Sequence, residues 1–170
     1  MKTKILAYIT RNKNGQLQLL VFDNRDYPDA GTQVPAGTVE EGEAIEAALF
    51  REVREESGLT NVQLVRKLAR YESQEWGTIR HVFHLHAPDD TPDSWQHTVH
   101  GNGEDAGLVF NYHWVELKEG LELAGNQHLW LGLIGVMQTD PPPPAPRISP
   151  PPESPAWHPC SAQISGAGCQ

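Results

Sequence analysis

The feature that most constrains this chain is one amphipathic segment with a glycine before it and another directly after it. Residues 43–57 are rich in Ala, Glu, Leu and Arg and contain no Gly or Pro, so they predict a helix over Glu43–Ser57. Gly58 follows at the position of a C-terminal helix cap. Four apolar side chains share one face at helical spacing: Ile45, Leu49, Val53 and, widening it, Phe50. We expect this face to pack on a sheet.

A second face of the same helix is acidic. Glu52, Glu55 and Glu56 lie three and four residues apart, so their carboxylates converge. Arg51 and Arg54 lie beside the cluster, where a helix that only needed to be soluble would usually pair such glutamates with lysine. Carboxylate oxygens grouped on one rigid element suit hard divalent cations, Mg²⁺ first and Mn²⁺ as a substitute. The alternative for this face taken by itself is a solvated acidic surface.

The spacing around the helix resembles the signature of the Nudix hydrolase family, Gly-x5-Glu-x7-Arg-Glu-aliphatic-x-Glu-Glu-x-Gly-aliphatic. Residues 37–59 agree with it at every defined position: Gly37, Glu43, Arg51, Glu52, Val53, Glu55, Glu56, Gly58 and Leu59. Seven identities at about 5–7% each, with two aliphatic positions, arise by chance on the order of 10⁻⁹ per window. The preceding Val34-Pro35-Ala36 is similar to the family's Pro-Gly-Gly lead, with Ala36 in place of the first glycine.

The resemblance implies a loop–helix–loop that binds divalent ions while water attacks a phosphorus of a nucleoside diphosphate derivative. Glu52, Glu55 and Glu56 would be the metal ligands. Gly37 would let the backbone approach the metal or phosphate closely, and Arg51 would orient the glutamates as a fixed fork of donors.

Other roles in the expected site stay open between alternatives. Glu43 would support the loop rather than bind metal, and Glu40 would either join the phosphate or metal site or remain outside it. The general base is Glu52 or a carboxylate from a later loop, where Glu104 is preferred over Asp105. The alternative for that loop is a plain polar turn.

Substrate recognition is less well specified by the sequence. Trp76 and Trp95 lie in expected loops and would either stack on a base or pack against the fold. Arg80, His84 and His86 alternate along one expected strand, so they share a face that meets phosphate or ribose, or is simply solvated. The Tyr, Pro, Ser-Gln-Pro-Trp and coenzyme A markers of particular Nudix subgroups are absent, so no subgroup is assigned.

The order of elements predicts an α/β fold, similar to the Nudix α/β/α sandwich with a mixed sheet. The Asn-Gly step at 14–15 predicts a hairpin between strands at 3–10 and 16–22. Later strands are expected at 62–72, 78–86 and 108–116, with a second helix over Leu121–Met137 whose apolar face includes Leu129, Leu131, Leu133 and Ile134. Residues 87–107 are expected to form a long polar loop.

Composition divides the chain into a domain, residues 1–137, and a tail, residues 138–170, that contains ten of the 14 prolines. Because the tail has few large apolar residues, we expect it to be disordered, with a proline-binding partner, no partner or an artefactual origin as alternatives. The net charge of −9 argues against nucleic acid and anionic membranes as partners. Both cysteines, Cys160 and Cys169, lie in the tail, which suits a cytoplasmic protein without a disulfide framework.

Three functions follow as hypotheses. The first is a Mg²⁺-dependent pyrophosphohydrolase acting on a nucleoside triphosphate, a nucleotide sugar or a related nucleoside diphosphate derivative, either as a monomer or as a homodimer. The second is a catalytically silent nucleotide-sensing module of the same fold, which would not need all three glutamates. The third is an acidic interaction protein whose proline-rich tail is the active part.

Overall fold

The computed structural model describes residues 1–135, so the predicted tail at 138–170 lies outside the described residues. The elements in chain order are β1 (Lys2–Lys13), β2 (Gln16–Asn24), η1 (Pro28–Ala30), β3 (Ala36–Thr38), α1 (Ile45–Ser57), β4 (Gln63–Ser73), β5 (Thr78–His86), β6 (Ser94–Thr98), β7 (Val109–Glu116), η2 (Ala124–Asn126) and α2 (Gly132–Gly135). The strands form one seven-stranded sheet in the order β4-β5-β1-β2-β7-β6, with β3 beside β1. The β1–β5 pair is parallel and the other pairs are antiparallel, so the predicted mixed sheet is confirmed.

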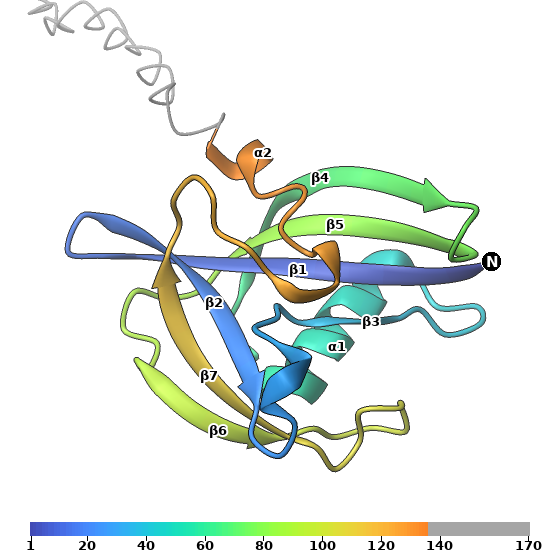
Figure 1. Cartoon of the computed structure of the whole chain (residues 1–170), viewed down its shortest axis with the longest axis horizontal. Coiled ribbons are helices and arrows are strands. Elements are labelled where there is room, and N and C mark those ends of the chain that lie inside the picture. The colour runs from blue at the N-terminus through green and yellow to red at the C-terminus, as the bar shows by residue number, and fades with distance from the viewer. Residues whose placement is uncertain (136–170) are drawn as a thin grey trace, which may run out of the picture. The chain divides into compact units, whose positions relative to one another are not determined.

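The long strand β1 organises the sheet (Figure 1). Its end forms the predicted hairpin with β2, and the turn places both Asn14 (φ 52°) and Gly15 (φ 76°) in the left-handed region, as a type I′ turn requires. The first half of β1 pairs with β3 instead, through Lys4–Leu6. β2 has therefore left β1 at this point, and the short strand β3 occupies its place next to α1.

Alternating residues of β1 face two separate cores. Ile5, Ala7 and Ile9 pack with α1 on one face, and Leu6 and Tyr8 pack beneath the C-terminal segment on the other. The sheet is therefore covered on both faces, which confirms the predicted fold class.

Helix α1 matches its prediction with two differences. It begins at Ile45, two residues later than expected. Leu49 and Val53 are fully buried as predicted, but Phe50 is 38% exposed. Position 50 lies 100° around the helix from Leu49, which places its ring at the edge of the buried stripe rather than inside it.

The predicted helix over Leu121–Met137 is wrong for the described residues. The chain forms only the turn η2 and the four-residue α2 there, because Gly125 (φ 61°) and Asn126 (φ 57°) adopt left-handed backbone conformations that break a right-handed helix. Gln127 instead holds the segment against the sheet: its side-chain oxygen accepts a hydrogen bond from the Val34 amide at 2.8 Å, and its carbonyl accepts one from the Tyr8 hydroxyl. Of the expected apolar face, Leu131 and Ile134 are buried, whereas Leu129 and Leu133 are exposed.

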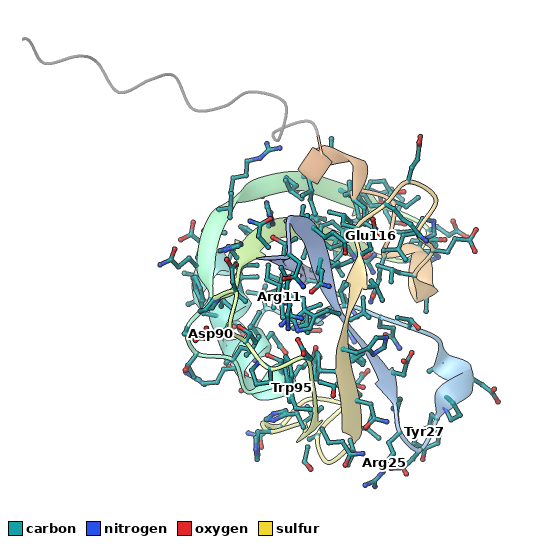
Figure 2. All side chains as sticks on the ribbon, turned by 90° about the vertical axis from the view of Figure 1, so that its left-hand side faces the viewer. Arg11, Arg25, Tyr27, Asp90, Trp95 and Glu116 are labelled. Atoms are coloured by element: carbon teal, nitrogen blue, oxygen red, sulfur yellow. The ribbon has the colours of Figure 1, made fainter. Side chains whose placement is uncertain are left out.

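The expected loop at 87–107 contains an unpredicted edge strand, β6, which pairs with β7 from Ser94↔His113 to Thr98↔Val109. Its residues are mostly polar, so the hydrophobic pattern gave little sign of a strand. Trp95 of β6 (Figure 2) packs against the buried core. Its ring stacks on Tyr112 at 5.1 Å between ring centroids. In the part of the chain that the structure describes, no helix has the length and apolar character needed to cross a bilayer.

Candidate active site

A cavity of about 480 Å³ opens where β3, α1, the start of β1 and the loop after β6 meet. Its charged and glycine lining residues include Lys2, Lys4, Gly37, Glu40, Arg51, Glu52, Glu55, Glu56, Arg80, Glu104 and Asp105. Its volume lies within the ordinary range for small-molecule sites.

The end of α1 is held in place by groups from three segments. Gly58 adopts φ 79° and its amide bonds to the Arg54 carbonyl, which closes the helix. The Glu55 carbonyl accepts bonds from the His97 ring at 2.9 Å and from the His100 amide at 3.0 Å. The Trp95 indole donates to the Ser57 carbonyl at 2.9 Å, so Trp95 packs against the fold rather than lying free to stack on a base.

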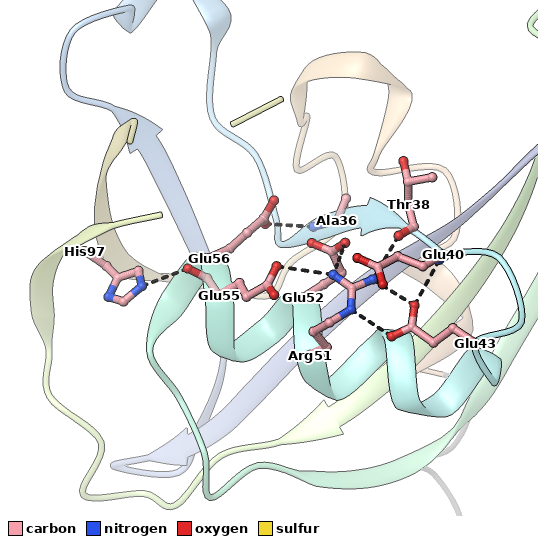
Figure 3. Close-up of polar contacts among 9 residues, drawn as sticks. All are labelled: Ala36, Thr38, Glu40, Glu43, Arg51, Glu52, Glu55, Glu56 and His97. Carbon is pink, nitrogen blue, oxygen red and sulfur yellow. Dashed lines mark hydrogen bonds and ion pairs between the residues drawn. The ribbon is translucent and has the colours of Figure 1, made fainter. Parts of the chain in front are cut away.

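Arg51 connects the acidic residues of α1 to the loop before it (Figure 3). Its Nε and Nη2 donate to both oxygens of Glu43 at 2.7 and 2.9 Å, and Nη1 donates to Glu52 at 2.9 Å and Glu55 at 3.2 Å. Nη2 also donates to the Thr38 carbonyl at 3.0 Å. One guanidinium therefore fixes two of the three carboxylates and the strand beside them.

The guanidinium group of Arg51 also fixes the position of Glu43. Hydrogen bonds from Arg51 lower the pKa of Glu43 to about 2, so it is ionised throughout the neutral range. Its Oε2 also accepts a bond from the Glu40 amide at 2.9 Å. Both oxygens of Glu43 are therefore engaged by Arg51, and one of them also holds the amide of the preceding loop.

The third carboxylate is in a different environment. Glu56 is only 4% exposed and accepts a 3.1 Å bond from the Ala36 amide on β3. Burial raises the pKa of Glu56 well above its usual value, and the neighbouring charges of Glu52 and Asp105 raise it further. Burial also raises the pKa of Glu52, opposed by its bond to Arg51.

Two glycines make room for these carboxylates. A Cβ on Gly37 would lie 1.9 Å from Cδ of Glu52, and a Cβ on Gly101 would lie 2.6 Å from Oε2 of Glu55. No real side chain tolerates such contacts, so both carboxylates lie directly against peptide backbone. At Gly37 the backbone lies against the Glu52 carboxylate, and a close approach to a metal or phosphate stays a prediction.

The donor set suits a hard divalent cation, although its oxygens are engaged within the protein. Within residues 1–135, no three His, Cys, Asp or Glu side chains are grouped as a ready metal site. Glu52 and Glu55 are turned toward Arg51, and Glu56 toward the Ala36 amide. Three carboxylates from one helix, all lining one cavity, nevertheless supply the oxygen ligands that Mg²⁺ prefers.

The structure brings most of the predicted site residues together. Glu40, Arg80, Glu104 and Asp105 line the cavity with the three carboxylates of α1. Trp76 does not: it is 51% exposed in the turn between β4 and β5 and is not among the cavity residues.

The histidines that were grouped with Arg80 also lie elsewhere. His84 forms a 2.7 Å hydrogen bond with the Thr10 hydroxyl, and burial lowers its pKa to about 4. His86 lies 3.6 Å from Asp89. Of these three residues, only Arg80 lines the cavity. Lys2 and Lys4 line it as well. The sequence did not single them out, because their proximity to Arg80 depends on the long-range pairing of β1 with β5.

Comparisons with known proteins agree with this geometry. The family model for the NUDIX domain matches residues 2–130. No curated protein sequence matches the chain.

Solved structures share the fold at low sequence identity. An Ap4A hydrolase binary complex from C. elegans is 18% identical with a TM-score of 0.60, covering 82% of this chain and 98% of that one. A mutT/nudix family protein from Listeria innocua is 21% identical with a TM-score of 0.52, covering 81% and 94%. The NUDIX domain of Shewanella oneidensis NrtR complexed with ADP ribose is 13% identical with a TM-score of 0.52, covering 80% and 87%. With the family model spanning most of the chain and five of the nine signature residues lining one cavity, this protein belongs to the Nudix hydrolase family.

Proposed function

We propose that this Nudix hydrolase is a Mg²⁺-dependent pyrophosphohydrolase of nucleoside diphosphate derivatives. The observation that carries the proposal is the convergence of Glu52, Glu55 and Glu56 on one cavity, with two of them pressed against glycine backbone. A surface that only needed to be solvated would not bury Glu56 or crowd Glu52 against Gly37.

Glu52, Glu55 and Glu56 would hold the cation. When bound, it would neutralise phosphate charge and lower the pKa of the attacking water. In the reaction, water attacks a phosphorus and one anhydride P–O bond breaks. The two products each carry phosphate, and one of them can be inorganic phosphate or pyrophosphate. A proton is released.

The chain's own residues would orient the site. Arg51 holds Glu52 and Glu55 on one side of the helix, and its bond to the Thr38 carbonyl ties that arrangement to β3. The Ala36 amide holds the third carboxylate, Glu56. Rigid placement of this kind is worth a large share of a catalytic rate, because displacement by about 1 Å costs on the order of 10²-fold.

We assign the general base to Glu104 in the loop after β6. This residue is exposed and lines the same cavity as the α1 carboxylates, so it has access to water. Its neighbour Asp105 also lines the cavity, and its charge acts on Glu56. Glu104 would take the proton from water, while Asp105 would mainly adjust the field around Glu56.

The experiment is product release from a panel of nucleoside triphosphates, nucleotide sugars and dinucleoside polyphosphates, with Mg²⁺ and with chelator. Glu56→Gln is the test variant. Glu46→Gln is the matched control, since Glu46 is an exposed acid in the first turn of the same helix and lies outside the cavity. Loss of turnover in Glu56→Gln alone supports the proposal. Turnover that survives in Glu56→Gln refutes the carboxylate site, and nucleotide binding without turnover by the wild type favours a sensing module.

A further inference from the structure

One wall of the cavity carries three cationic side chains that have no carboxylate partner. Lys2 and Lys4 on β1 and Arg80 on β5 all line it. Among the described residues, none of the three belongs to an ion pair within 4.0 Å. Arg51, which lines the same cavity, is by contrast paired with three glutamates, Glu43, Glu52 and Glu55.

The sheet register places these cations next to one another. In the parallel β1–β5 pair, Lys4 is the direct partner of Arg80, and Lys2 lies two residues earlier on the same face of β1. Like charges on directly paired positions of a sheet repel each other. The arrangement is therefore unfavourable in the free protein, and a bound anion would relieve it.

Aromatic residues hold Arg80 in position without neutralising its charge. Its guanidinium lies 5.8 Å from the centre of the Trp130 ring, and that ring packs on Tyr71 at 5.6 Å. Tyr71 is also the partner of Arg80 in the β4–β5 register. Among the described residues, Arg80 donates no side-chain hydrogen bond, so its donors remain available to the cavity.

The partial burial of Arg80 also indicates that this side chain serves to bind an anion. Arg80 is half-buried, and this desolvation lowers its pKa from the ordinary value for arginine. A charge kept in such surroundings without a partner has a free-energy cost, and natural proteins accept such costs mainly at functional sites.

The cavity therefore has two places for negative charge. The first is the α1 carboxylate set, where a divalent cation would accept the diphosphate that is cleaved. The second is the wall formed by Lys2, Lys4 and Arg80. A nucleoside diphosphate linked to an uncharged sugar would leave this second place without an anion.

Resting on the proposed function, we infer that Lys2, Lys4 and Arg80 bind the phosphates that lie beyond the cleaved anhydride. The preferred substrates are then nucleotides with three or more linked phosphates, rather than nucleotide sugars. Arg80 contributes most, because its planar fork is pre-positioned on Trp130, whereas Lys2 is exposed and retains its side-chain freedom.

The first test measures anion binding without catalysis. Inorganic tripolyphosphate is titrated calorimetrically into the full chain with chelator at low ionic strength. Arg80→Gln is expected to weaken binding at least 10-fold, and Arg80→Lys to restore part of it. Arg70→Gln is the control, since Arg70 lies on the neighbouring strand β4, is 50% exposed and does not line the cavity. Equal binding by wild type and Arg80→Gln, or no binding by the wild type, overturns the inference.

The second test compares kcat/KM for ATP and ADP-ribose, which share a nucleoside. The wild type is expected to prefer ATP, and Arg80→Gln to reduce that preference at least 10-fold. An unchanged ratio refutes the role of Arg80 in specificity even when hydrolysis is robust. If no substrate is hydrolysed but Arg80→Gln still loses tripolyphosphate binding, the proposed function fails while the anion-binding wall stands.

Discussion

Replacing Gly37 with alanine adds one methyl group at the most crowded point of the site. The new Cβ would lie 1.9 Å from Cδ of Glu52 and 2.2 and 2.4 Å from its two oxygens, whereas ordinary contacts begin at 3.4 Å. The Glu52 carboxylate must therefore withdraw by about 1.5 Å. Gly37 is not in the left-handed region, so alanine itself causes no backbone strain.

The displacement of Glu52 is expected to lower activity strongly while changing the stability of the fold little. A shift of this size in a catalytic carboxylate is expected to lower kcat/KM on the order of 10²-fold. The side chain that moves is flexible, so the free energy of unfolding should change by no more than about 1 kcal/mol. Gly132→Ala is the control, because a Cβ there meets nothing within 4 Å and Gly132 does not line the cavity.

Mg²⁺-dependent hydrolysis and urea denaturation of the two variants test this reasoning. The expected result is a large loss of kcat/KM for Gly37→Ala at near wild-type stability, with Gly132→Ala unaffected in activity. Wild-type kcat/KM in Gly37→Ala would show that the position of Glu52 is not critical. A loss of more than about 3 kcal/mol in stability would show that the effect is structural.

Four further changes test separate parts of the account. Arg51→Lys keeps the charge but not the fork, so kcat in steady-state assays should fall by about 10-fold or more; unchanged kcat would contradict the positioning role. Glu43→Gln should lower the free energy of unfolding by about 1–2 kcal/mol at pH 7. Because the folded pKa of Glu43 is depressed to about 2, this contribution exists above its unfolded pKa of about 4.5 and is lost as pH falls toward 2. Urea titrations should therefore show the difference shrinking between pH 5 and pH 2, and a constant difference would refute the ion pair. Gly58→Ala should cost about 1–2 kcal/mol in denaturant unfolding, because φ 79° strains alanine and a Cβ would lie 3.1 Å from the His97 ring; a neutral effect would contradict the cap. Glu104→Gln should reduce kcat more than Asp105→Asn does, and the reverse order would move the general base to Asp105.

Local periodicity explains which parts of the fold and site were predictable. The turn at Asn14–Gly15, the helix α1 and the convergence of Glu52, Glu55 and Glu56 depend on residues a few positions apart. The left-handed turn and the 3.6-residue repeat are then sufficient to place them. The hairpin turn and the helix agree with the structure, and the three glutamates line one cavity, whereas their role as metal ligands stays a prediction.

Long-range contacts explain what was missed. The C-terminal segment has helical spacing, but Gly125 and Asn126 take left-handed conformations, and Gln127 bonds to Val34 and Tyr8 far away in the sequence. Tertiary contacts there outweigh local propensity.

The remaining differences have the same origin. Strand β6 is recognisable only through its pairing with β7, because its own residues are mostly polar. The juxtaposition of Lys4 and Arg80 depends on a parallel register between strands more than 70 residues apart, which no local pattern encodes.

Direct measurement of metal binding tests the central claim most closely. Mn²⁺ is paramagnetic and substitutes for Mg²⁺ at carboxylate sites, so electron paramagnetic resonance reports free and bound ion without any substrate. The wild type and Glu46→Gln are expected to bind Mn²⁺, and the triple variant Glu52→Gln, Glu55→Gln, Glu56→Gln to lose that binding while remaining folded. Equal Mn²⁺ binding by the triple variant and the wild type would contradict the assignment of the α1 carboxylates as the metal site.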